Sequence, residues 1–464
     1  MRFIGREDEL ELLDKEYNRD SSLAVVYGRK RVGKTALIKQ FIKKKKALYF
    51  LASEENDRQN LNEFTEKIAD YINHPYIASS RIDSWQNAFK LFASYERKEK
   101  KILIIDEFQY LVSGNSAYPS IIREAWNEIL KDSNVMVILC ASDIGMMSSH
   151  LLSHSGPLYS IHTAQIRLQP LSFGEFASAF PGRTFAELTE LYSVTGGMPK
   201  YFEFFDNKFS LWKNVTDTIL NKSGFLHEEP FFLLEKEVRE PANYVSIMTA
   251  LSHGNHKLSK IAGYMEQKTT SISPYLVMLT ELFLVEKRVP VTEKTPGKSR
   301  RGLYYISDNF IEFWFKFVQP YRSELEMDKT EYVLKKIKSD FIENHVSNVF
   351  QVISREIFVS LCKSGKIDFV PSVVGAYWNS DIEIDVVATC KKGNKIFAGE
   401  CQYCEKPVSA YVYLDLQKKC SNIPEFGKKK IVYGIFSKSG FDPELIKLAK
   451  ETPGLYLFDK GKLV

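Results

Sequence analysis

The sequence predicts an α/β fold in three parts: a domain with a parallel sheet, a mostly helical segment, and a smaller α/β domain. Three observations favour this fold class. Residues 1–205 alternate short β-branched runs with helical stretches, as in a βαβ series. Residues 206–325 have mainly helical spacing and many aromatic side chains. After a charged stretch, residues 340–464 return to apolar runs separated by turn residues. We therefore predict domains at these three ranges.

Composition restricts the class of protein. Of 464 residues, 44% are hydrophobic and 26% are charged, which is typical of globular proteins and excludes disordered, collagen-like and coiled-coil chains. No apolar run reaches the roughly 18 residues of a membrane helix, and the first ten residues are too charged for a signal peptide. Six cysteines are too few for a disulfide framework. We expect a cytoplasmic protein with no membrane partner.

Charge is distributed unevenly along the chain. The formal net charge is +5, from 63 basic and 58 acidic residues. The segment Lys391–Val464 holds 14 lysines and 8 acidic residues, so its net charge is +6 and the rest of the chain is close to neutral. A basic region of this kind favours a polyanionic partner such as DNA, although many basic tails are only solvated lysine faces.

The first part of the chain alternates predicted strands and helices. The strands are expected at Leu23–Tyr27, Ala47–Phe50, Ile102–Ile105, Val135–Cys140 and Ala164–Leu168. The helices between them include Lys34–Lys43, Trp85–Tyr95 and Ile121–Leu130. This order predicts a sheet of parallel strands with helical crossovers.

The remainder has a different pattern. We predict a helical segment from about Leu211 to Leu234, three short helices at Ser246–Leu251, Leu258–Met265 and Ser271–Leu282, and strands at Val289–Val291 and Leu303–Ile306. A packed aromatic helix over Phe310–Val318 and a charged link over Ser323–Ser339 follow. A further helix precedes strands at Ile382–Ala388, Ile396–Cys401 and Lys430–Phe436.

A glycine-rich loop stands between the first predicted strand and the helix after it. Its residues are Gly28, Arg29, Lys30, Arg31, Val32, Gly33, Lys34 and Thr35, which match G-x-x-x-x-G-K-[ST]. Such a loop directs backbone N–H groups and a helix N-terminus toward a phosphate. Lys34 then reaches the β- and γ-phosphates, and the Thr35 hydroxyl ligates Mg²⁺. The alternative, a chance match, is weakened because the strand and the helix are both present.

A second motif supports this interpretation. The run KILIIDEFQY is an apolar strand that ends in Asp106 and Glu107. A carboxylate at this strand end is where Mg²⁺ needs a further ligand, and Glu107 is placed to activate the attacking water. The alternative is a buried strand that merely ends in solvated acids. The two motifs together predict a P-loop NTPase domain that uses ATP and Mg²⁺.

With these motifs, further segments in a fixed order resemble a known family. They are FIGRE with Glu9-Leu10, GRKRVGKT, IIDEFQYL, Ser142 after VILCA, PLYSIHTAQIRLQPLSF and TGGMP at residues 195–199. The chain resembles the prokaryotic AAA+/STAND-type ATPases called archaeal ATPases, relatives of the origin-recognition ATPases. The resemblance covers essentially the whole chain. It implies an ATPase domain, a winged helix, and a C-terminal domain of restriction-endonuclease, PD-(D/E)xK type.

The resemblance also implies roles for single residues. Gly5 and Arg6 of the FIGRE box, with Gly197 and Pro199 of the GGMP turn, flank the adenine in that family. Ser142 matches the position that contacts the γ-phosphate. We therefore assign Lys34, Glu107 and Ser142 as catalytic.

One segment departs from the family pattern. The family shows arginine after LYG, where this chain has Ser160-Ile161-His162. An arginine finger accelerates phosphoryl transfer by about 10³–10⁵, so its loss predicts slow hydrolysis or a finger from elsewhere. Arg167 is a poor candidate because it lies within a predicted strand. A slow ATPase behaves as a switch.

The three short helices and the following strands have the order of a winged helix. Ser271–Leu282 takes the place of the recognition helix, but it is apolar and has few base-reading groups. The wing region has a net charge of +4, from six basic residues (Lys287, Arg288, Lys294, Lys298, Arg300 and Arg301) and two acidic ones. Such a wing can follow DNA phosphates without sequence specificity. The alternative is a hinge between domains.

The C-terminal domain places Asp385 and Glu400 on neighbouring predicted strands, where two carboxylates can hold Mg²⁺. The spacing resembles a restriction-endonuclease core. The usual lysine is replaced by Gln402 and the usual helical glutamate by Gln351, while Lys406 is the nearest substitute ammonium. These departures favour an inactive domain that binds DNA or protein over an active nuclease.

Cys401-x-x-Cys404, with Cys390 and Cys420, also suggests zinc. Because no histidine accompanies them, buried cysteines are the favoured interpretation.

The sequence thus predicts an ATP-dependent switch that contacts DNA. The alternatives are an ATP-licensed nuclease and a signalling scaffold with little turnover. An oligomer or a protein partner is compatible with the sequence.

Overall fold

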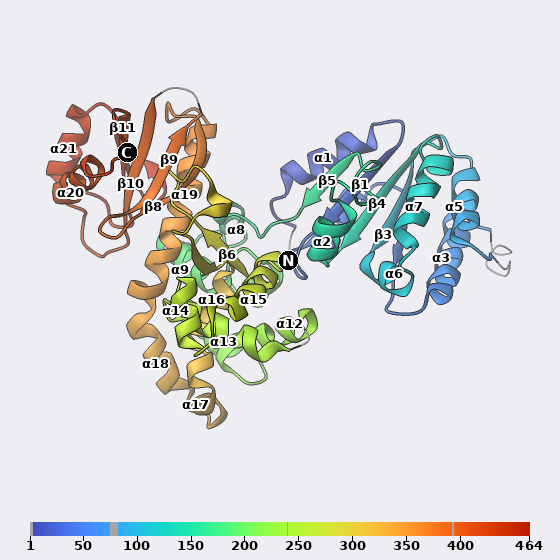
Figure 1. The fold of residues 1–464 in the computed structure, drawn as a ribbon, viewed down its shortest axis with the longest axis horizontal. Coiled ribbons are helices and arrows are strands. Elements are labelled where there is room, and N and C mark those ends of the chain that lie inside the picture. Colours follow the sequence, from blue (N-terminus) through green and yellow to red (C-terminus); the bar gives the residue numbers. More distant parts are fainter. Residues whose placement is uncertain (1–2, 75–81, 239, 392–393) are drawn as a thin grey trace. The chain divides into compact units, whose positions relative to one another are not determined.

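The computed structural model describes residues 3–74, 82–238, 240–391 and 394–464. The chain forms two compact units (Figure 1). The first unit contains residues 1–170 together with 198–200, and the second contains residues 171–197 together with 201–464. The chain therefore leaves the first unit at residue 171, returns briefly at 198, and leaves it again at 201.

The first unit is built on five parallel strands: β1 (Ser22–Tyr27), β2 (Ala47–Leu51), β3 (Lys101–Asp106), β4 (Val135–Ala141) and β5 (Ala164–Arg167). Their order across the sheet is β2-β3-β4-β1-β5. Every residue of β1, β3 and β4 is buried, which explains their continuous apolar sequences: helices cover both faces of a parallel sheet. The five predicted strands are confirmed, with ends that differ by at most one residue.

Helices connect these strands. They are α1 (Glu7–Tyr17), α2 (Lys34–Phe41), α3 (Asp57–Ile72), α5 (Trp85–Ser94), α6 (Gln109–Gly114) and α7 (Tyr118–Ala125), which continues into the π-helical turn η1 (Trp126–Leu130); η2 (Met146–Leu151) follows β4. In Figure 1, α1 and α2 lie on one side of the sheet, and α3, α5 and α7 lie on the other. Because all strands are parallel, the carboxyl ends of β1, β3 and β4 meet at one edge.

The second unit begins with α8 (Phe173–Ala177) and α9 (Phe185–Thr195). Ser172 and Thr184 each start a capping box, in which a side-chain oxygen and a glutamate satisfy backbone N–H groups. The short helices α10 (Pro199–Phe202), α11 (Leu211–Val215), η3 (Thr216–Leu220) and α12 (Glu229–Glu237) follow.

The helical segment predicted over Leu211–Leu234 contains α11, η3 and the first part of α12, and the chain turns between η3 and α12. At Gly224 a Cβ atom would lie 2.4 Å from the carbonyl oxygen of Thr218, so the turn requires glycine there.

Three helices and a hairpin come next: α13 (Pro241–Ser252), α14 (Leu258–Tyr264), α15 (Thr269–Glu281), β6 (Val285–Arg288) and β7 (Leu303–Ile306). The three predicted helices are confirmed. The first strand was expected at Val289–Val291, but it ends at Arg288. Beyond it, the Val291 N–H donates to the carbonyl of Ala376 in the C-terminal sheet, so this segment leaves the hairpin.

A helical layer connects the hairpin to the C-terminal sheet. It consists of α16 (Asn309–Phe317), η5 (Gln319–Tyr321), α17 (Arg322–Glu326), α18 (Thr330–Phe341), η6 (Ile342–Val346) and α19 (Ser347–Lys363). The aromatic helix is confirmed as α16, most of which is buried. The predicted charged link over Ser323–Ser339 is wrong, because most of it is helical. Val333, Ile337 and Phe341 form a buried stripe at helical spacing between exposed charges.

The C-terminal sheet has six strands: β8 (Pro371–Trp378), β9 (Glu383–Cys390), β10 (Lys395–Gln402), β11 (Lys430–Ser437), β12 (Leu455–Asp459) and β13 (Lys462–Leu463). Their order is β13-β12-β11-β10-β9-β8. Helices α20 (Ala410–Ser421) and α21 (Pro443–Glu451) pack on it. The three predicted strands correspond to β9, β10 and β11. Among the described residues, no helix has both the length and the apolar character needed to cross a lipid bilayer.

Helix α9 is contacted by both halves of the second unit. Its Ser193 carbonyl accepts a hydrogen bond from His345 Nε2 at 2.7 Å, and Asn309 donates to the carbonyl of Tyr192 at 3.1 Å. From the C-terminal sheet, the Tyr403 hydroxyl lies 3.3 Å from Glu190 Oε1. The helical layer and the C-terminal sheet are thus both attached to α9.

Candidate functional site

The glycine-rich loop lies at the carboxyl end of β1 and runs into α2. At Gly28 a Cβ atom would lie 2.5 Å from the carbonyl oxygen of Leu168, so no larger residue fits. Gly33 has φ 101° and precedes α2, a backbone conformation that favours glycine. The two glycines of the motif are therefore required for different reasons, one steric and one conformational.

Lys34 is buried inside this loop. Its Nζ donates to the carbonyl oxygens of Gly28 at 2.8 Å and of Arg29 at 3.0 Å. Burial lowers the pKa of Lys34, while the nearby Cys140, Glu107 and Asp106 act in the opposite direction. The loop thus curls around a single ammonium group.

The other loop residues are arranged around this core. Arg29 and Val32 are buried, Lys30 is half-buried, and Arg31 has a left-handed φ of 75°. Opposite Gly33 lies Pro199: its Cγ is 3.7 Å from the position that a Cβ of Gly33 would take. Loop and turn, distant in sequence, are therefore side by side within the first unit.

Two residues assigned to adenine have clear structural contacts. Arg6 is buried, and its guanidinium donates to the carbonyls of Val32 at 3.2 Å and Gln169 at 2.6 Å. It therefore braces the glycine-rich loop; Gly5 precedes it with φ 63°. Gly197 belongs to the second unit, where a Cβ atom would lie 1.9 Å from the Leu171 carbonyl oxygen. Their role toward adenine stays a prediction.

Asp106 is at the end of β3, buried to 1% exposure. Its Oδ2 accepts hydrogen bonds from the Thr35 hydroxyl at 3.0 Å and from the Tyr49 hydroxyl at 2.5 Å. Its Oδ1 accepts from the Glu107 N–H at 2.9 Å. Burial and Asp106 raise the pKa of Tyr49. A hydroxyl and a carboxylate at this separation are hard oxygen ligands of the type that Mg²⁺ prefers.

Glu107 follows with φ 54°, a left-handed conformation that is uncommon for glutamate. The Ser142 hydroxyl donates to Glu107 Oε2 at 3.0 Å, and Gln109 Nε2 donates to the same oxygen. Gln109 also accepts from the Ser142 backbone N–H at 3.1 Å. These three residues form a closed hydrogen-bonded ring, which is completed by the Ser142 backbone. The sequence predicted Glu107 and Ser142 as site residues, but it gave no indication of Gln109 or Tyr49.

The structure therefore brings Lys34, Thr35, Asp106, Glu107 and Ser142 together at one sheet edge. Arg167 lies at the end of β5, in a strand as predicted.

A second group of polar residues lies in the C-terminal sheet. Asp385 on β9 and Glu400 on β10 are both buried, and Asp385 Oδ2 accepts from the Cys401 N–H at 2.8 Å. Lys419 Nζ on α20 lies 2.8 Å from Glu400 Oε1. Burial and the neighbouring Asp385 raise the pKa of Glu400 to about 8, and burial also raises the pKa of Asp385. The two predicted carboxylates are brought together.

A lysine other than Lys406 contacts this carboxylate pair. Lys406, considered from the sequence as a substitute ammonium, is exposed in the turn after β10. The cation at Glu400 is Lys419, and Arg355 on α19 donates to the Asp385 carbonyl at 2.8 Å. Gln351 lies on the same helix α19 and Gln402 at the end of β10. No sequence spacing indicates Lys419, because α20 reaches Glu400 only through the fold.

Zinc is not supported. Within the described parts of the chain, no group of three or more His, Cys, Asp or Glu side chains could hold a metal ion. Burial raises the pKa of Cys401 and that of Cys420, which disfavours the thiolate that zinc needs.

The basic wing is partly engaged by acidic residues. Arg301 pairs with Glu293 at 3.2 Å and with Glu425 of the C-terminal domain at 3.4 Å. Arg288 pairs with Glu286 and stacks on Tyr305. The remaining basic residues of the wing, Lys287, Lys294, Lys298 and Arg300, are exposed. Arg301 is thus placed to hold the hairpin against the C-terminal domain.

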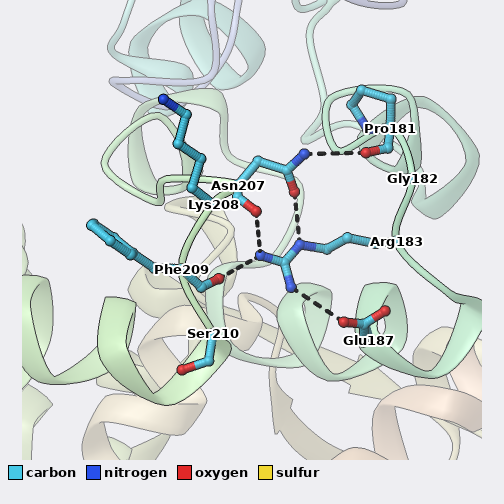
Figure 2. A pocket seen from close by; sticks show the side chains of 8 residues that line it. All are labelled: Pro181, Gly182, Arg183, Glu187, Asn207, Lys208, Phe209 and Ser210. Carbon is cyan, nitrogen blue, oxygen red and sulfur yellow. Dashed lines mark hydrogen bonds and ion pairs between the residues drawn. The ribbon is translucent and has the colours of Figure 1, made fainter.

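Figure 2 shows a shallow surface pocket in the second unit, centred on Arg183. Its guanidinium donates to Asn207 Oδ1 at 2.8 Å and to the carbonyls of Asn207 and Phe209 at 2.9 and 2.6 Å. The third guanidinium nitrogen faces Glu187 at 3.6 Å. With all three nitrogens engaged, this arginine joins the start of α9 to the turn before α11, and we assign it a structural role.

Comparisons with known proteins agree with the site at the first sheet. Residues 3–205 match a family model described as an ATPase domain predominantly from Archaea. Residues 314–413 match a model described as "Archaea bacterial proteins of unknown function". An uncharacterized protein of Methanocaldococcus jannaschii, MJECL04, is 31% identical over 421 residues, which cover 90% of this chain and 91% of the relative.

Two further similarities are more limited. An uncharacterized ATP-binding protein of the same organism, MJ0423, is 49% identical over 45 residues, or 10% of this chain and 76% of the relative. The solved structure of the Walker-type ATPase PABY2304 of Pyrococcus abyssi has a TM-score of 0.50 at 17% identity, covering 68% of this chain and 96% of that one. This likeness concerns the fold alone.

The P-loop at β1, the acidic end of β3 and the near full-length relative lead to one assignment. The chain belongs to this family of archaeal ATPases, in which an ATP-binding ATPase domain is followed by the C-terminal domain type matched at residues 314–413.

Proposed function

We propose that the protein is a slow ATPase that acts as a nucleotide-dependent switch. The observation that carries this proposal is the convergence of Lys34, Thr35, Asp106, Glu107 and Ser142 at one edge of the first sheet. Lys34 pairs with the β- and γ-phosphates, and Ser142 contacts the γ-phosphate. Glu107 orients the attacking water and accepts its proton. Thr35 and Asp106 would hold Mg²⁺, which would neutralise charge on the phosphates when bound.

Slow turnover is supported by the segment Ser160–His162, which lacks the arginine of the family pattern. An ATPase without a finger stays in the ATP-bound state for longer, which suits a switch. The moving element is α9: it belongs to the second unit and leads through Gly196 and Gly197 to Pro199 beside the loop. A change at Pro199 would thus reach the helix on which the rest of the second unit is packed.

The test is a measurement of ATP turnover with Mg²⁺, with and without DNA, alongside nucleotide affinity. We expect nucleotide binding in the micromolar range, typical of such sites, with a turnover well below 1 s⁻¹, roughly the lower limit for ordinary enzymes. A wild-type protein that binds no ATP would contradict the proposal. Fast turnover, above about 10 s⁻¹, would contradict the switch.

We further propose contact with DNA phosphates through the exposed wing residues Lys294, Lys298 and Arg300 and through the basic segment Lys391–Val464. Their support is charge: lysine and arginine side chains on the surface release counterions when they meet phosphates. Arg301 is left out of this set because of its two ion pairs. The test is binding of a duplex of random sequence at increasing salt concentration.

A second candidate function is an ATP-licensed nuclease, favoured by Lys419 beside Asp385 and Glu400. The two carboxylates are suited to Mg²⁺, and Lys419 supplies the ammonium that Gln402 cannot, next to the oxygen ligands that would hold a phosphodiester. The raised pKa of Glu400 indicates one proton shared by the pair, which a divalent cation would displace.

Cleavage of plasmid DNA in Mg²⁺ and ATP tests this second function. If the domain is a nuclease, cleavage is lost in both Asp385→Ala and Lys419→Met, with binding of DNA retained. Cleavage that survives both substitutions would assign it to a contaminant. An inert wild-type protein would leave the domain as a binding module, which is the alternative that the substitutions Gln351 and Gln402 favour.

A further inference from the structure

Tyr49 reaches the proposed magnesium site from the edge of the sheet. It lies on β2, in register with Ile104 on β3, two residues before Asp106. Its hydroxyl nevertheless extends along the sheet to Asp106 Oδ2, at 2.5 Å. The same oxygen accepts from Thr35 at 3.0 Å. Two hydroxyl groups from different elements thus meet on one carboxylate oxygen.

We infer that Tyr49 is a positioning residue for the metal ligands: its hydroxyl fixes the Asp106 carboxylate in the orientation that faces Thr35. This inference rests on the proposed ATPase function and extends it to a residue outside the P-loop and the strand end. The tyrosine itself is not a metal ligand in this account. It acts through Asp106.

The hydrogen-bond pattern explains why a second donor is useful. Asp106 Oδ1 is held by the Glu107 N–H at 2.9 Å, which fixes one end of the carboxylate. Thr35 holds the other end, but its hydroxyl has a second task, because its oxygen would also ligate the metal through a lone pair. Tyr49 has no such second task, so its hydroxyl keeps Oδ2 in place whether or not the metal is bound.

Burial strengthens this argument. Asp106 is 1% exposed, so its carboxylate depends on protein donors rather than on bulk water. Hydrogen bonds to a charged acceptor are the stronger kind. Tyr49 itself is only half-buried, and β2 is an edge strand, so removing the hydroxyl alone disturbs little packing.

The test compares Tyr49→Phe with the wild type in two kinds of measurement. The first is the affinity for a fluorescent ATP analogue, in EDTA and over a series of Mg²⁺ concentrations. In EDTA we expect Tyr49→Phe to bind the analogue as tightly as the wild type. Mg²⁺ strengthens binding, and we expect the variant to need about a tenfold higher Mg²⁺ concentration to reach half of that increase in affinity. This is the effect of losing one charge-assisted hydrogen bond. The second is hydrolysis, in which kcat should recover at saturating Mg²⁺.

Tyr71→Phe is the matched control. Tyr71 is a buried tyrosine on α3, and its hydroxyl accepts a hydrogen bond from Arg97 at 3.3 Å. We expect wild-type dependence on Mg²⁺ in this variant. Asp106→Asn is the opposite control and should abolish most of the Mg²⁺ effect on affinity. A thermal unfolding midpoint within about 2 °C of the wild type checks that each variant is folded.

The inference would be overturned if Tyr49→Phe needed the same Mg²⁺ concentration as the wild type, or a lower one, for half of the increase in nucleotide affinity. The proposed ATPase function can fail separately. A wild-type protein that binds nucleotide in Mg²⁺ without hydrolysing it would contradict the proposed hydrolysis but not the proposed role of Tyr49. The affinity measurement needs no turnover and still decides the role of Tyr49.

Discussion

Ser142 donates its hydroxyl to the carboxylate of Glu107, with 3.0 Å between Ser142 Oγ and Glu107 Oε2. The two residues are contributed by the ends of neighbouring strands, β4 and β3, whose parallel pairing brings them together. Gln109 donates to the same carboxylate oxygen. The group proposed to activate water is therefore held by two neutral donors, which fix its direction without adding charge.

Replacing Glu107 with Gln should preserve ATP binding and reduce hydrolysis by about 10²–10⁴-fold, because only the proton acceptor is removed. Single-turnover hydrolysis and equilibrium binding of radiolabelled ATP measure the two effects. Lys34→Ala is the contrasting variant: it removes the cation at the phosphates and should weaken binding itself. Hydrolysis by Glu107→Gln at the wild-type rate would show that the base is another residue.

Replacing Gln109 with Met, a residue of similar length without an amide, should lower kcat by about tenfold and leave KM nearly unchanged. A misdirected carboxylate costs rate rather than substrate affinity. Steady-state kinetics give kcat and KM. A parallel loss of kcat and affinity would indicate general damage to the site instead.

His345 makes the stability of the second unit depend on pH. Its ring is fully buried among aromatic side chains, and burial lowers its pKa to about 3. The folded state therefore holds a neutral ring, while the unfolded state binds a proton below about pH 6.5. Stability is complete above that pH and is lost as the pH falls toward 3. Between pH 7 and pH 5 this one group should lower the free energy of unfolding by about 2 kcal/mol.

His345→Gln keeps an N–H donor for the Ser193 carbonyl but cannot be protonated in this range. We expect the difference in unfolding free energy between the variant and the wild type to favour the variant by about 2 kcal/mol more at pH 5 than at pH 7. Urea denaturation at several pH values measures it. Identical pH slopes for the two proteins would show that His345 is protonated in the folded state.

The exposed basic residues of the wing and the ion-paired Arg301 should differ in their effect on DNA binding. Lys298→Ala with Arg300→Ala should weaken DNA binding for all sequences and reduce the slope of log affinity against log salt by about 2. Arg301→Ala should instead leave that slope unchanged and loosen the hairpin, since its partners are Glu293 and Glu425. Binding isotherms at four salt concentrations and hydrogen exchange of β6 and β7 measure these outcomes. A slope that changes with Arg301 alone would reverse the assignment.

The sequence predicted the parts of the site that lie close together along the chain. Lys34 and Thr35 follow from the spacing of one loop, and Asp106 and Glu107 follow from one apolar strand. Tyr49 and Lys419 were missed because their partners are brought to them by sheet register or helix packing, which leave no local spacing. Gln109 lies only two residues from Glu107, but its contact with Ser142 depends on the pairing of β3 with β4. Helix α18 was missed because charged residues surround its buried stripe of Val333, Ile337 and Phe341.

The route of the chain between residues 171 and 197 affects how the protein can be divided for expression. Helices α8 and α9 stand early in the sequence, but they pack in the second unit. There the Phe185 ring contacts Phe350 and lies 3.0 Å from the position that a Cβ of Gly461 would take. A fragment that stops at residue 205 would expose Phe173, Phe185 and Tyr192 to water, and a fragment that starts at 206 would lack the helix that its other parts surround. Both halves should precipitate when made alone and should be recovered by co-expression, as pieces of one cooperative fold.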